Sequence, residues 1–197
     1  MDEQRASLVV DPANWEKCRA SQISILKAKG LKPEHKLLDL GCGVLVGGIA
    51  SMEYLDTGNY WGLDNSDKRL EEAMKEVGDS GLIWKQPKPK LRLGYDEIKK
   101  EGIKFDYVWF HQVIIHMLDE VAQEVFHFIS KVLADDGKCY ITANIADENK
   151  TSYSTMKYPC EWDLVYRTED FYKSIADNAR LEVTAIEGDM ITIQHKG

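Results

Sequence analysis

The chain of 197 residues carries 25 Lys and Arg against 33 Asp and Glu, a net charge of −8 at pH 7. This length suits one α/β domain with its own core, and the acidic balance argues against a broad nucleic-acid interface, which needs a basic face to neutralise phosphates. No apolar run approaches a membrane span and the first residues are too polar for a secretory signal, so we expect a cytoplasmic protein that contacts neither membranes nor nucleic acid.

The first 35 residues are expected to contain a helix. Apolar residues recur in them at helical spacing, and Gly30 is placed to end the helix. Trp15 on this helix has two alternative roles. It packs against the core, which its large apolar area favours, or it forms part of a substrate wall.

The most informative stretch is residues 37–50, which read L-L-D-L-G-C-G-V-L-V-G-G-I-A. Its leucines predict a short, buried parallel strand that ends at Gly41. Gly41 and Gly43 lack a Cβ, so the backbone can take positive φ and a ligand can lie against the main chain. Residues 44–55 then predict a helix, with two glycines in its first turns that allow close packing on the sheet. The bend therefore predicts a binding loop.

The next strand, residues 60–64, ends in Asp64, which comes 21 residues after Gly43. An acid at about this spacing accepts hydrogen bonds from ribose hydroxyls in nucleotide-binding α/β folds. The glycine spacing G-x-G-x-x-x-G differs from the dinucleotide pattern, and Asp39 lies just before the bend. A carboxylate there would repel a diphosphate at the helix N-terminus. It would attract an ammonium group, so the pattern argues against NAD and favours S-adenosylmethionine.

Further βα units follow in the chain. Capping residues 65–67 begin a second crossover helix, and the basic, proline-rich stretch 85–90 predicts an exposed loop before a third strand at 91–93. Residues 105–110 predict a buried fourth strand. In open α/β sheets ligands bind outside the carboxyl ends of the strands, so Gly41, Asp64 and His111 are expected to converge.

The last third of the chain predicts a helix, a long loop and a closing hairpin. Asp119 begins a long amphipathic helix, and an apolar strand follows at 139–142. Residues 144–167 lack periodicity and predict a long functional loop. A helix capped by Thr168 and two strands, 181–187 and 189–195, complete the chain.

These residues resemble the class I S-adenosylmethionine-dependent methyltransferases. D-L-G-C-G at 39–43 is similar to the family's first motif, and F-D-Y-V at 105–108 with V-I-I-H-M at 113–117 is similar to its fourth-strand segment. The resemblance implies a Rossmann-like α/β fold with a seven-stranded sheet, mostly parallel with an antiparallel C-terminal strand and helices on both faces. It also implies a single domain, with a helical segment at 1–35 and the core at 36–197.

Two positions depart from the family pattern. Leu45 stands where many members carry a third glycine, which leaves less room near the amino acid end of the cofactor. The acid that many members have after the third strand has Asp96 as its nearest candidate. The resemblance therefore does not assign the adenine contacts.

Methyl transfer from a sulfonium needs alignment and exclusion of water above all, and a base only when the acceptor atom arrives protonated. The catalytic candidates are His111 and His116, because histidine titrates near neutral pH. A structural role for His116, fixing the turn before the long helix, is an equal alternative. The residues predicted to bind the cofactor are Asp39, Gly41, Cys42, Gly43, Asp64, Asn65 and His111.

No metal site is expected. No Asp ends the fourth strand, where catechol-type methyltransferases carry acidic metal ligands. The cysteines contain no C-x-x-C pair, so they suggest neither zinc nor a disulfide framework. They are Cys18, Cys42, Cys139 and Cys160.

We therefore predict an S-adenosylmethionine-dependent methyltransferase that acts on a small-molecule acceptor. One alternative is a non-catalytic protein that binds S-adenosylmethionine or S-adenosylhomocysteine. Another is an enzyme of the same fold that uses the cofactor for a different transfer, such as that of an aminopropyl group. An NAD enzyme is disfavoured by Asp39 and by the glycine spacing.

Overall fold

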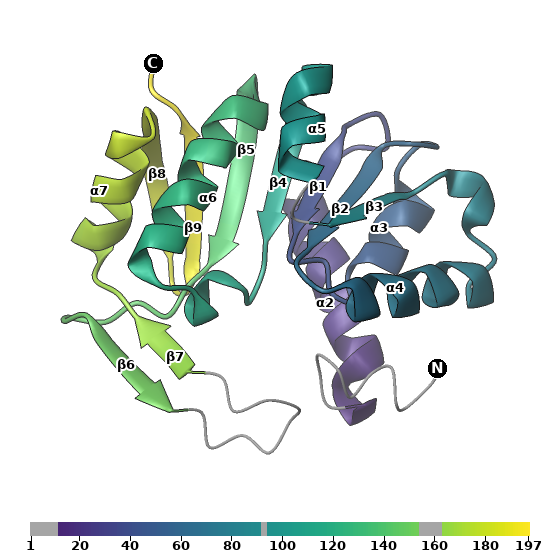
Figure 1. Ribbon diagram of the computed structural model, residues 1–197, viewed down its shortest axis with the longest axis horizontal. Coiled ribbons are helices and arrows are strands. Elements are labelled where there is room, and N and C mark those ends of the chain that lie inside the picture. The colour runs from purple at the N-terminus through teal and green to yellow at the C-terminus, as the bar shows by residue number, and fades with distance from the viewer. Residues whose placement is uncertain (1–11, 92–93, 154–162) are drawn as a thin grey trace. The chain divides into compact units, whose positions relative to one another are not determined.

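The structure is a computed structural model that describes residues 12–91, 94–153 and 163–197 (Figure 1). The chain divides into two compact units, residues 1–94 with 157–160 and residues 95–156 with 161–197. No helix within the described ranges is long and apolar enough to cross a membrane.

The first unit builds a parallel sheet in the order β3-β2-β1. Its strands are β1 (Leu37–Leu40), β2 (Tyr60–Asp64) and β3 (Lys88–Leu91). Its helices are η1 (Pro12–Asn14), α2 (Trp15–Ala28), α3 (Gly48–Tyr54), α4 (Asp67–Asp79) and η2 (Ile83–Lys85). Every residue of β1 and β2 is buried, as expected for parallel strands covered on both faces.

Local sequence explains where α4 begins. The Ser66 hydroxyl accepts a hydrogen bond from the main-chain N–H of Arg69, so Ser66 is the N-cap, and Asp67 follows in the first turn. Ala73 and Val77 bury the inner face of the helix. These features confirm the second crossover helix.

Two predicted boundaries in the first unit were wrong. The helix expected at 44–55 begins only at Gly48, because Leu45 has φ 67°, which is incompatible with an α-helix. Residues 88–91, part of the predicted exposed loop, form β3 and pair with no described strand other than β2. An edge strand tolerates Pro89 because one side of it needs no N–H donor. Of the strand expected at 91–93, only Leu91 belongs to β3, and residues 92–93 lie outside the described chain.

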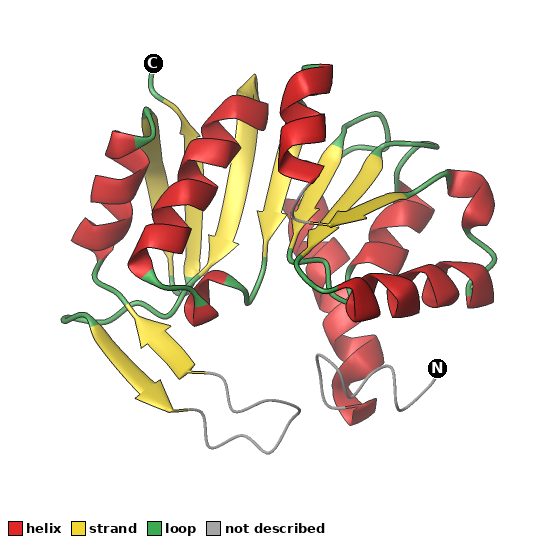
Figure 2. Ribbon diagram, in the orientation of Figure 1, coloured by secondary structure: helices red, strands yellow, loops and turns green. Residues whose placement is uncertain are grey.

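The second unit builds strands in the order β4-β5-β9-β8, with β4 and β5 parallel and β9 antiparallel to both of its neighbours. These strands are β4 (Phe105–Phe110), β5 (Leu133–Thr142), β8 (Leu181–Glu187) and β9 (Met190–His195). The helices are α5 (Gly94–Glu101), η3 (Ile114–His116), α6 (Asp119–Val132) and α7 (Glu169–Asn178). Figure 2 shows the helices in red and the strands in yellow. The predicted fourth strand, long helix and C-terminal hairpin are confirmed.

The stretch 144–167 is not a loop throughout, so that prediction was wrong. It contains β6 (Lys150–Tyr153) and β7 (Asp163–Tyr166), which pair antiparallel as a separate two-stranded sheet (Figure 1). Arg167 anchors the end of β7 to α6, because its Nε donates to Asp119 Oδ1 at 2.7 Å. Residues 154–162, with Cys160, lie outside the described part of the chain, as does the side chain of Asp96.

Candidate functional site

The bend after β1 is held by main-chain and side-chain acceptors of β2. The N–H groups of Gly41 and Cys42 both donate to the Leu63 carbonyl, at 2.7 and 3.0 Å. The N–H of Gly43 donates to Asp64 Oδ2 at 3.0 Å. Phosphate-binding loops instead direct successive N–H groups at the ligand. The three N–H groups at 41–43 are therefore already used within the chain and do not form an anion site.

Asp39 is a buried carboxylate beside this bend. It is 7% exposed, and its Oδ2 accepts a hydrogen bond from the Tyr60 hydroxyl at 2.7 Å. Burial raises the pKa of Asp39 to about 7, with a further increase from the charge of Asp64 and a decrease from the Tyr60 hydrogen bond. Burial also raises the pKa of Tyr60, so the phenol keeps its proton as the donor. Within the described residues no cationic side chain pairs with Asp39, which leaves its negative charge uncompensated.

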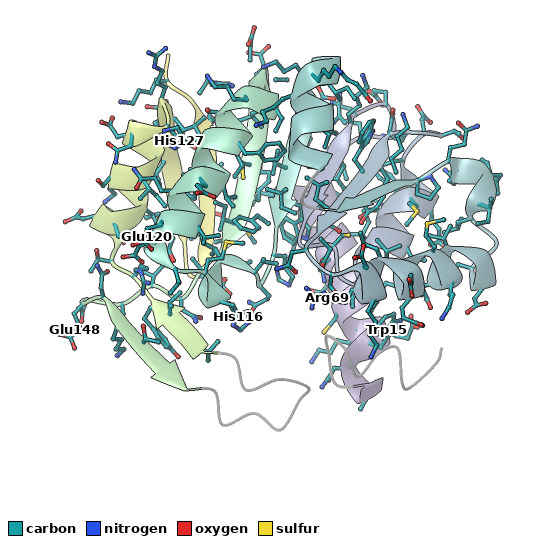
Figure 3. All side chains as sticks on the ribbon, viewed as in Figure 1. Trp15, Arg69, His116, Glu120, His127 and Glu148 are labelled. Atoms are coloured by element: carbon teal, nitrogen blue, oxygen red, sulfur yellow. The ribbon has the colours of Figure 1, made fainter. Side chains whose placement is uncertain are left out.

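Asp64 at the end of β2 is also 7% exposed, but it has a cationic partner. Its Oδ1 accepts from the Ser66 N–H and from Arg69 Nε, both at 2.9 Å. Arg69 Nη2 bridges to Asn65 Oδ1 at 2.6 Å. Figure 3 shows Arg69 at the start of α4. Oδ1 is thus engaged, whereas among the described residues Oδ2 accepts only from Gly43, which leaves it a lone pair for a ligand hydroxyl.

Tight packing supports the bend from behind. The Cys42 sulfur lies 2.8 Å from the position that a Cβ would take on Gly62, so the Cys42 side chain packs on β2. Leu45 is fully buried, and its φ of 67° lies in the left-handed region, which strains the backbone of a residue with a side chain. Gly48 leaves room for both Leu45 and Tyr60.

In the second unit, His111 is fixed at the carboxyl end of β4. Its ring stacks on Trp109 with centroids 5.1 Å apart and planes 12° apart. Its Nδ1 lies 3.2 Å from the hydroxyl of Thr142, the last residue of β5. Burial lowers the pKa of His111 to about 4, although the charge of Asp189 opposes this shift. The imidazole is therefore neutral at physiological pH.

His116 and Trp15 have different surroundings. His116 is the last residue of η3, and its N–H donates to the Val113 carbonyl (Figure 3). Trp15 in α2 is fully buried with the Arg19 guanidinium 5.4 Å from its ring centroid, which favours the packing role over a substrate wall.

The structure brings six of the predicted residues together at one bend and its adjoining strands. These are Asp39, Gly41, Cys42, Gly43, Asp64 and Asn65. His111 and His116 belong to the second unit, so the convergence of His111 with this bend stays a prediction.

Three described residues whose side chains hydrogen-bond to side chains of the predicted set were missed. They are Tyr60, which hydrogen-bonds to Asp39, Arg69, which hydrogen-bonds to Asp64, and Thr142, which hydrogen-bonds with His111. A usable signal existed for Tyr60, because alternate residues of a strand face the same side and parallel pairing sets Asp39 opposite Gly62. Thr142 carried a similar signal as the polar end of an apolar strand.

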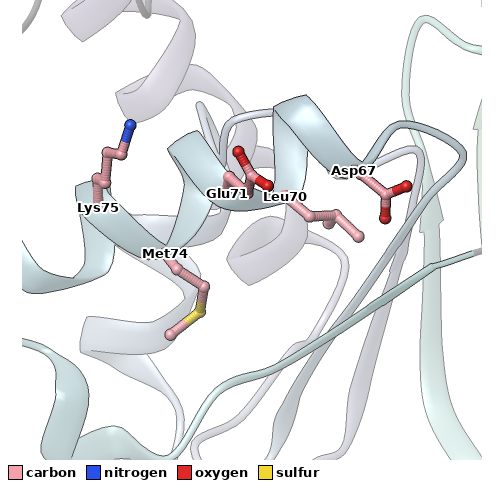
Figure 4. Close-up of a pocket in the computed structure, with 5 residues that line it drawn as sticks. All are labelled: Asp67, Leu70, Glu71, Met74 and Lys75. Atoms are coloured by element: carbon pink, nitrogen blue, oxygen red, sulfur yellow. The ribbon is translucent and has the colours of Figure 1, made fainter.

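A hollow on the surface of α4 does not contribute to this site. Its lining side chains all come from that one helix: Asp67, Leu70, Glu71, Met74 and Lys75 (Figure 4). None of them is a predicted site residue. The described residues also contain no cluster of His, Cys, Asp and Glu that could hold a metal ion.

Comparison with known sequences identifies a family. Residues 38–139, which are 102 of the 197 residues, match a family model described as a methyltransferase domain. The chain is also 30% identical over 125 residues to an uncharacterized protein of Rickettsia prowazekii (strain Madrid E), a match that covers 61% of this chain and 49% of that protein. The chain thus spans about half the length of this curated relative.

Solved structures share the fold. Magnesium protoporphyrin IX methyltransferase (ChlM) from Synechocystis PCC 6803, with bound S-adenosylmethionine, gives a TM-score of 0.64 at 18% identity over 93% of this chain and 81% of its own. The glycopeptide N-methyltransferase MtfA with sinefungin gives 0.68 at 9% identity over 91% and 94%. An S-adenosylmethionine-dependent methyltransferase from Clostridium acetobutylicum ATCC 824 gives 0.64 at 14% identity over 92% and 92%.

These likenesses, together with the seven strands of the larger sheet in the described residues and its single antiparallel strand β9, confirm the predicted Rossmann-like α/β fold class. The family match covers the segment that contains the bend, Asp64 and β4. The chain therefore belongs to the methyltransferase-domain family, as its resemblance to the class I S-adenosylmethionine-dependent methyltransferases predicts.

Proposed function

We propose that this chain binds S-adenosylmethionine at the bend between Asp39 and Asp64 and transfers its methyl group to a small-molecule acceptor. The observation that carries the proposal is the charge pattern of the bend. A buried carboxylate without a cationic partner among the described residues, Asp39, lies beside main-chain N–H groups that are turned inward. Such a site suits a cationic ligand, and S-adenosylmethionine carries both an ammonium and a sulfonium. The solved neighbours crystallised with this cofactor or its analogues support the same proposal.

Each residue at the bend has a role in binding. The Asp39 carboxylate attracts the ammonium group, and the absence of side chains at Gly41 and Gly43 allows close approach. Asp64 accepts a ribose hydroxyl at Oδ2, while Arg69 holds the other oxygen in place. The bound cofactor supplies an activated methyl group. The protein needs only to align the acceptor and exclude water, because the sulfonium charge disappears as the methyl group leaves.

The same geometry argues against NAD. A diphosphate requires free N–H donors at the bend, and those of Gly41, Cys42 and Gly43 are already bonded to Leu63 and Asp64. A negative ligand would also meet two buried acids. Calorimetry with S-adenosylhomocysteine and with NADH should therefore show binding of the first ligand and not of the second; the reverse result would contradict the proposal.

Catalysis is tested with S-adenosylmethionine tritiated on its methyl group and a pool of cellular small molecules as acceptors. We expect label in the acceptor fraction and release of S-adenosylhomocysteine. Tight S-adenosylhomocysteine binding with no labelled product would favour the non-catalytic alternative. A methylthioadenosine product would favour the same-fold alternative, in which the aminocarboxypropyl group of S-adenosylmethionine is transferred and its methyl group stays on sulfur.

Replacing Asp64 with alanine should weaken S-adenosylhomocysteine binding by about 1–2 kcal/mol, through loss of a charged hydrogen bond to the ribose. The loss is limited because Arg69 already engages Oδ1. Calorimetry measures the change. The matched control is Arg69→Met, which keeps the carboxylate and removes its cation; it should lose less affinity than Asp64→Ala, because the N–H groups of Gly43 and Ser66 still hold the carboxylate. Equal losses in both variants would show that Asp64 acts only through Arg69.

A further inference from the structure

Within the part of the chain that the structure describes, the Thr142 side chain has two hydrogen-bond contacts, and both involve the chain just after β4. Its Oγ1 accepts from the Gln112 N–H at 2.6 Å and lies 3.2 Å from His111 Nδ1. Gln112 has φ 58°, a conformation that its side chain disfavours, so the hydroxyl helps to hold a strained backbone in place. The parallel register that pairs Phe110 with Ile141 places these residues next to one another.

These contacts decide where the hydroxyl proton goes. Thr142 is 2% exposed, and His111 Nδ1 is the sole acceptor that the described residues offer to its O–H. If Nδ1 carried a proton and donated to Thr142, the buried hydroxyl proton would have no partner, at a cost of about 1–3 kcal/mol. If the hydroxyl donates to Nδ1, both groups are satisfied. The network therefore assigns Nδ1 as an acceptor.

The remaining proton of the neutral ring then lies on Nε2. The lowered pKa of His111 is consistent with a neutral ring. Nε2 has no hydrogen-bond partner among the residues that the structure describes. His111 is only part-buried and its orientation is fixed by the stacking on Trp109, so Nε2–H is a pre-oriented donor.

We infer that Thr142 is a positioning residue that holds His111 protonated at Nε2, so that His111 donates a hydrogen bond to the methyl acceptor and does not serve as its general base. This role rests on the proposed methyl transfer, whereas the tautomer does not. A group that donates through Nε2–H cannot take a proton at the same nitrogen. The acceptor must then present a lone pair to His111, and His116 is left as the histidine for any proton removal.

The tautomer is tested by long-range ¹H–¹⁵N spectra of the intact protein, with the signals of His111 among the 5 histidines assigned from a His111→Gln variant. We expect a protonated Nε2 and an unprotonated Nδ1. Thr142→Val should convert His111 to a mixture of both tautomers, and Thr142→Ser should restore the single form. A protonated Nδ1 in the parent protein, or unchanged His111 signals in Thr142→Val, would overturn the inference. The parent spectrum alone is decisive if Thr142→Val does not fold.

The donor role is tested in the tritium assay with the same acceptor pool. Glutamine can present an amide N–H near the position of Nε2 but cannot act as a base. We expect His111→Ala to lose on the order of 100-fold in rate, and His111→Gln to keep at least tenfold more activity than His111→Ala. Equal losses would identify a base and refute the donor role. Unchanged S-adenosylhomocysteine affinity in both variants would show that the loss of rate does not come from weaker cofactor binding. If the parent protein shows no turnover, the proposed methyl transfer is rejected, and the spectra still decide the tautomer.

Discussion

Asp39→Asn should stabilise the protein above pH 7 and weaken cofactor binding at the same time. The carboxyl group has a pKa of about 7 in the folded protein, against an ordinary value of 3.8 for an aspartate in water. Between these values the folded state holds more protons than the unfolded state, so Asp39 makes stability fall as pH rises from about 4 to about 7. A shift of this size corresponds to about 4 kcal/mol at pH 8. Asparagine removes the buried charge, so Asp39→Asn should regain about 3 kcal/mol of this lost stability. The remainder is the cost of desolvating the asparagine amide.

Cofactor binding should change in the opposite direction. An ammonium beside Asp39 stabilises the ionised carboxylate, so the affinity of the parent protein for S-adenosylhomocysteine should rise as pH increases from about 5.5 to about 7.5. Asp39→Asn should remove this slope and lose about 2–3 kcal/mol of binding free energy at the upper end. Urea unfolding and calorimetry across the pH series measure the two effects.

Asp56→Asn is the matched control, because it makes the same charge change at an exposed position of the same unit. It should leave both measurements close to those of the parent. His111 also makes stability depend on pH. Burial lowers its pKa to about 4, so His111 destabilises the folded state as pH falls below about 6.5 in every variant. The stability of each variant is therefore compared with that of the parent at the same pH. An Asp39→Asn protein that is less stable at pH 8 and still shows the affinity slope would contradict this account of the bend.

The parts of the fold that follow from local pattern were predictable. β4 is a run of buried apolar and aromatic residues interrupted only by Asp106, and α4 and α7 are each preceded by a hydroxyl side chain that accepts the expected capping hydrogen bond. β3 was not predictable in the same way, because its Lys and Pro residues resemble a solvated loop. Such residues are typical of an edge strand, where they discourage pairing with other chains. Whether a strand lies at the edge depends on the whole sheet, so the sequence of the strand alone does not predict it.

The candidate site shows the same division. Asp39, Asp64 and the two glycines of the bend are close in sequence or linked by a known spacing, so motif reasoning reaches them. Tyr60 and Thr142 act across neighbouring strands, and their contacts depend on the register that aligns β1 with β2 and β4 with β5. The start of α3 at Gly48 depends on strain at Leu45. Sequence pattern alone supplies neither register nor strain.

Gly48→Ala should destabilise the protein by about 2–3 kcal/mol and weaken cofactor binding, although alanine has the higher helix propensity. The new methyl group would lie 2.4 Å from the Tyr60 hydroxyl oxygen and 2.7 Å from Leu45 Cδ2. Both side chains are buried, so neither can move aside without strain. A displaced Tyr60 would also lose its hydrogen bond to Asp39, so the packing defect would weaken cofactor binding as well as stability.

Gly78→Ala is the matched control for this effect, since a Cβ there meets nothing within 4 Å and the residue also lies in a helix. It should be neutral or gain up to about 1 kcal/mol of stability. Adding Tyr60→Phe to Gly48→Ala removes the closest clash, so the double variant should recover part of the lost stability, while cofactor binding stays weak because Asp39 lacks its donor. Thermal or urea unfolding and calorimetry on all four proteins separate these effects. A Gly48→Ala protein as stable as Gly78→Ala would mean that Leu45 and Tyr60 yield to the methyl group, and that the bend is not braced by the close packing behind it.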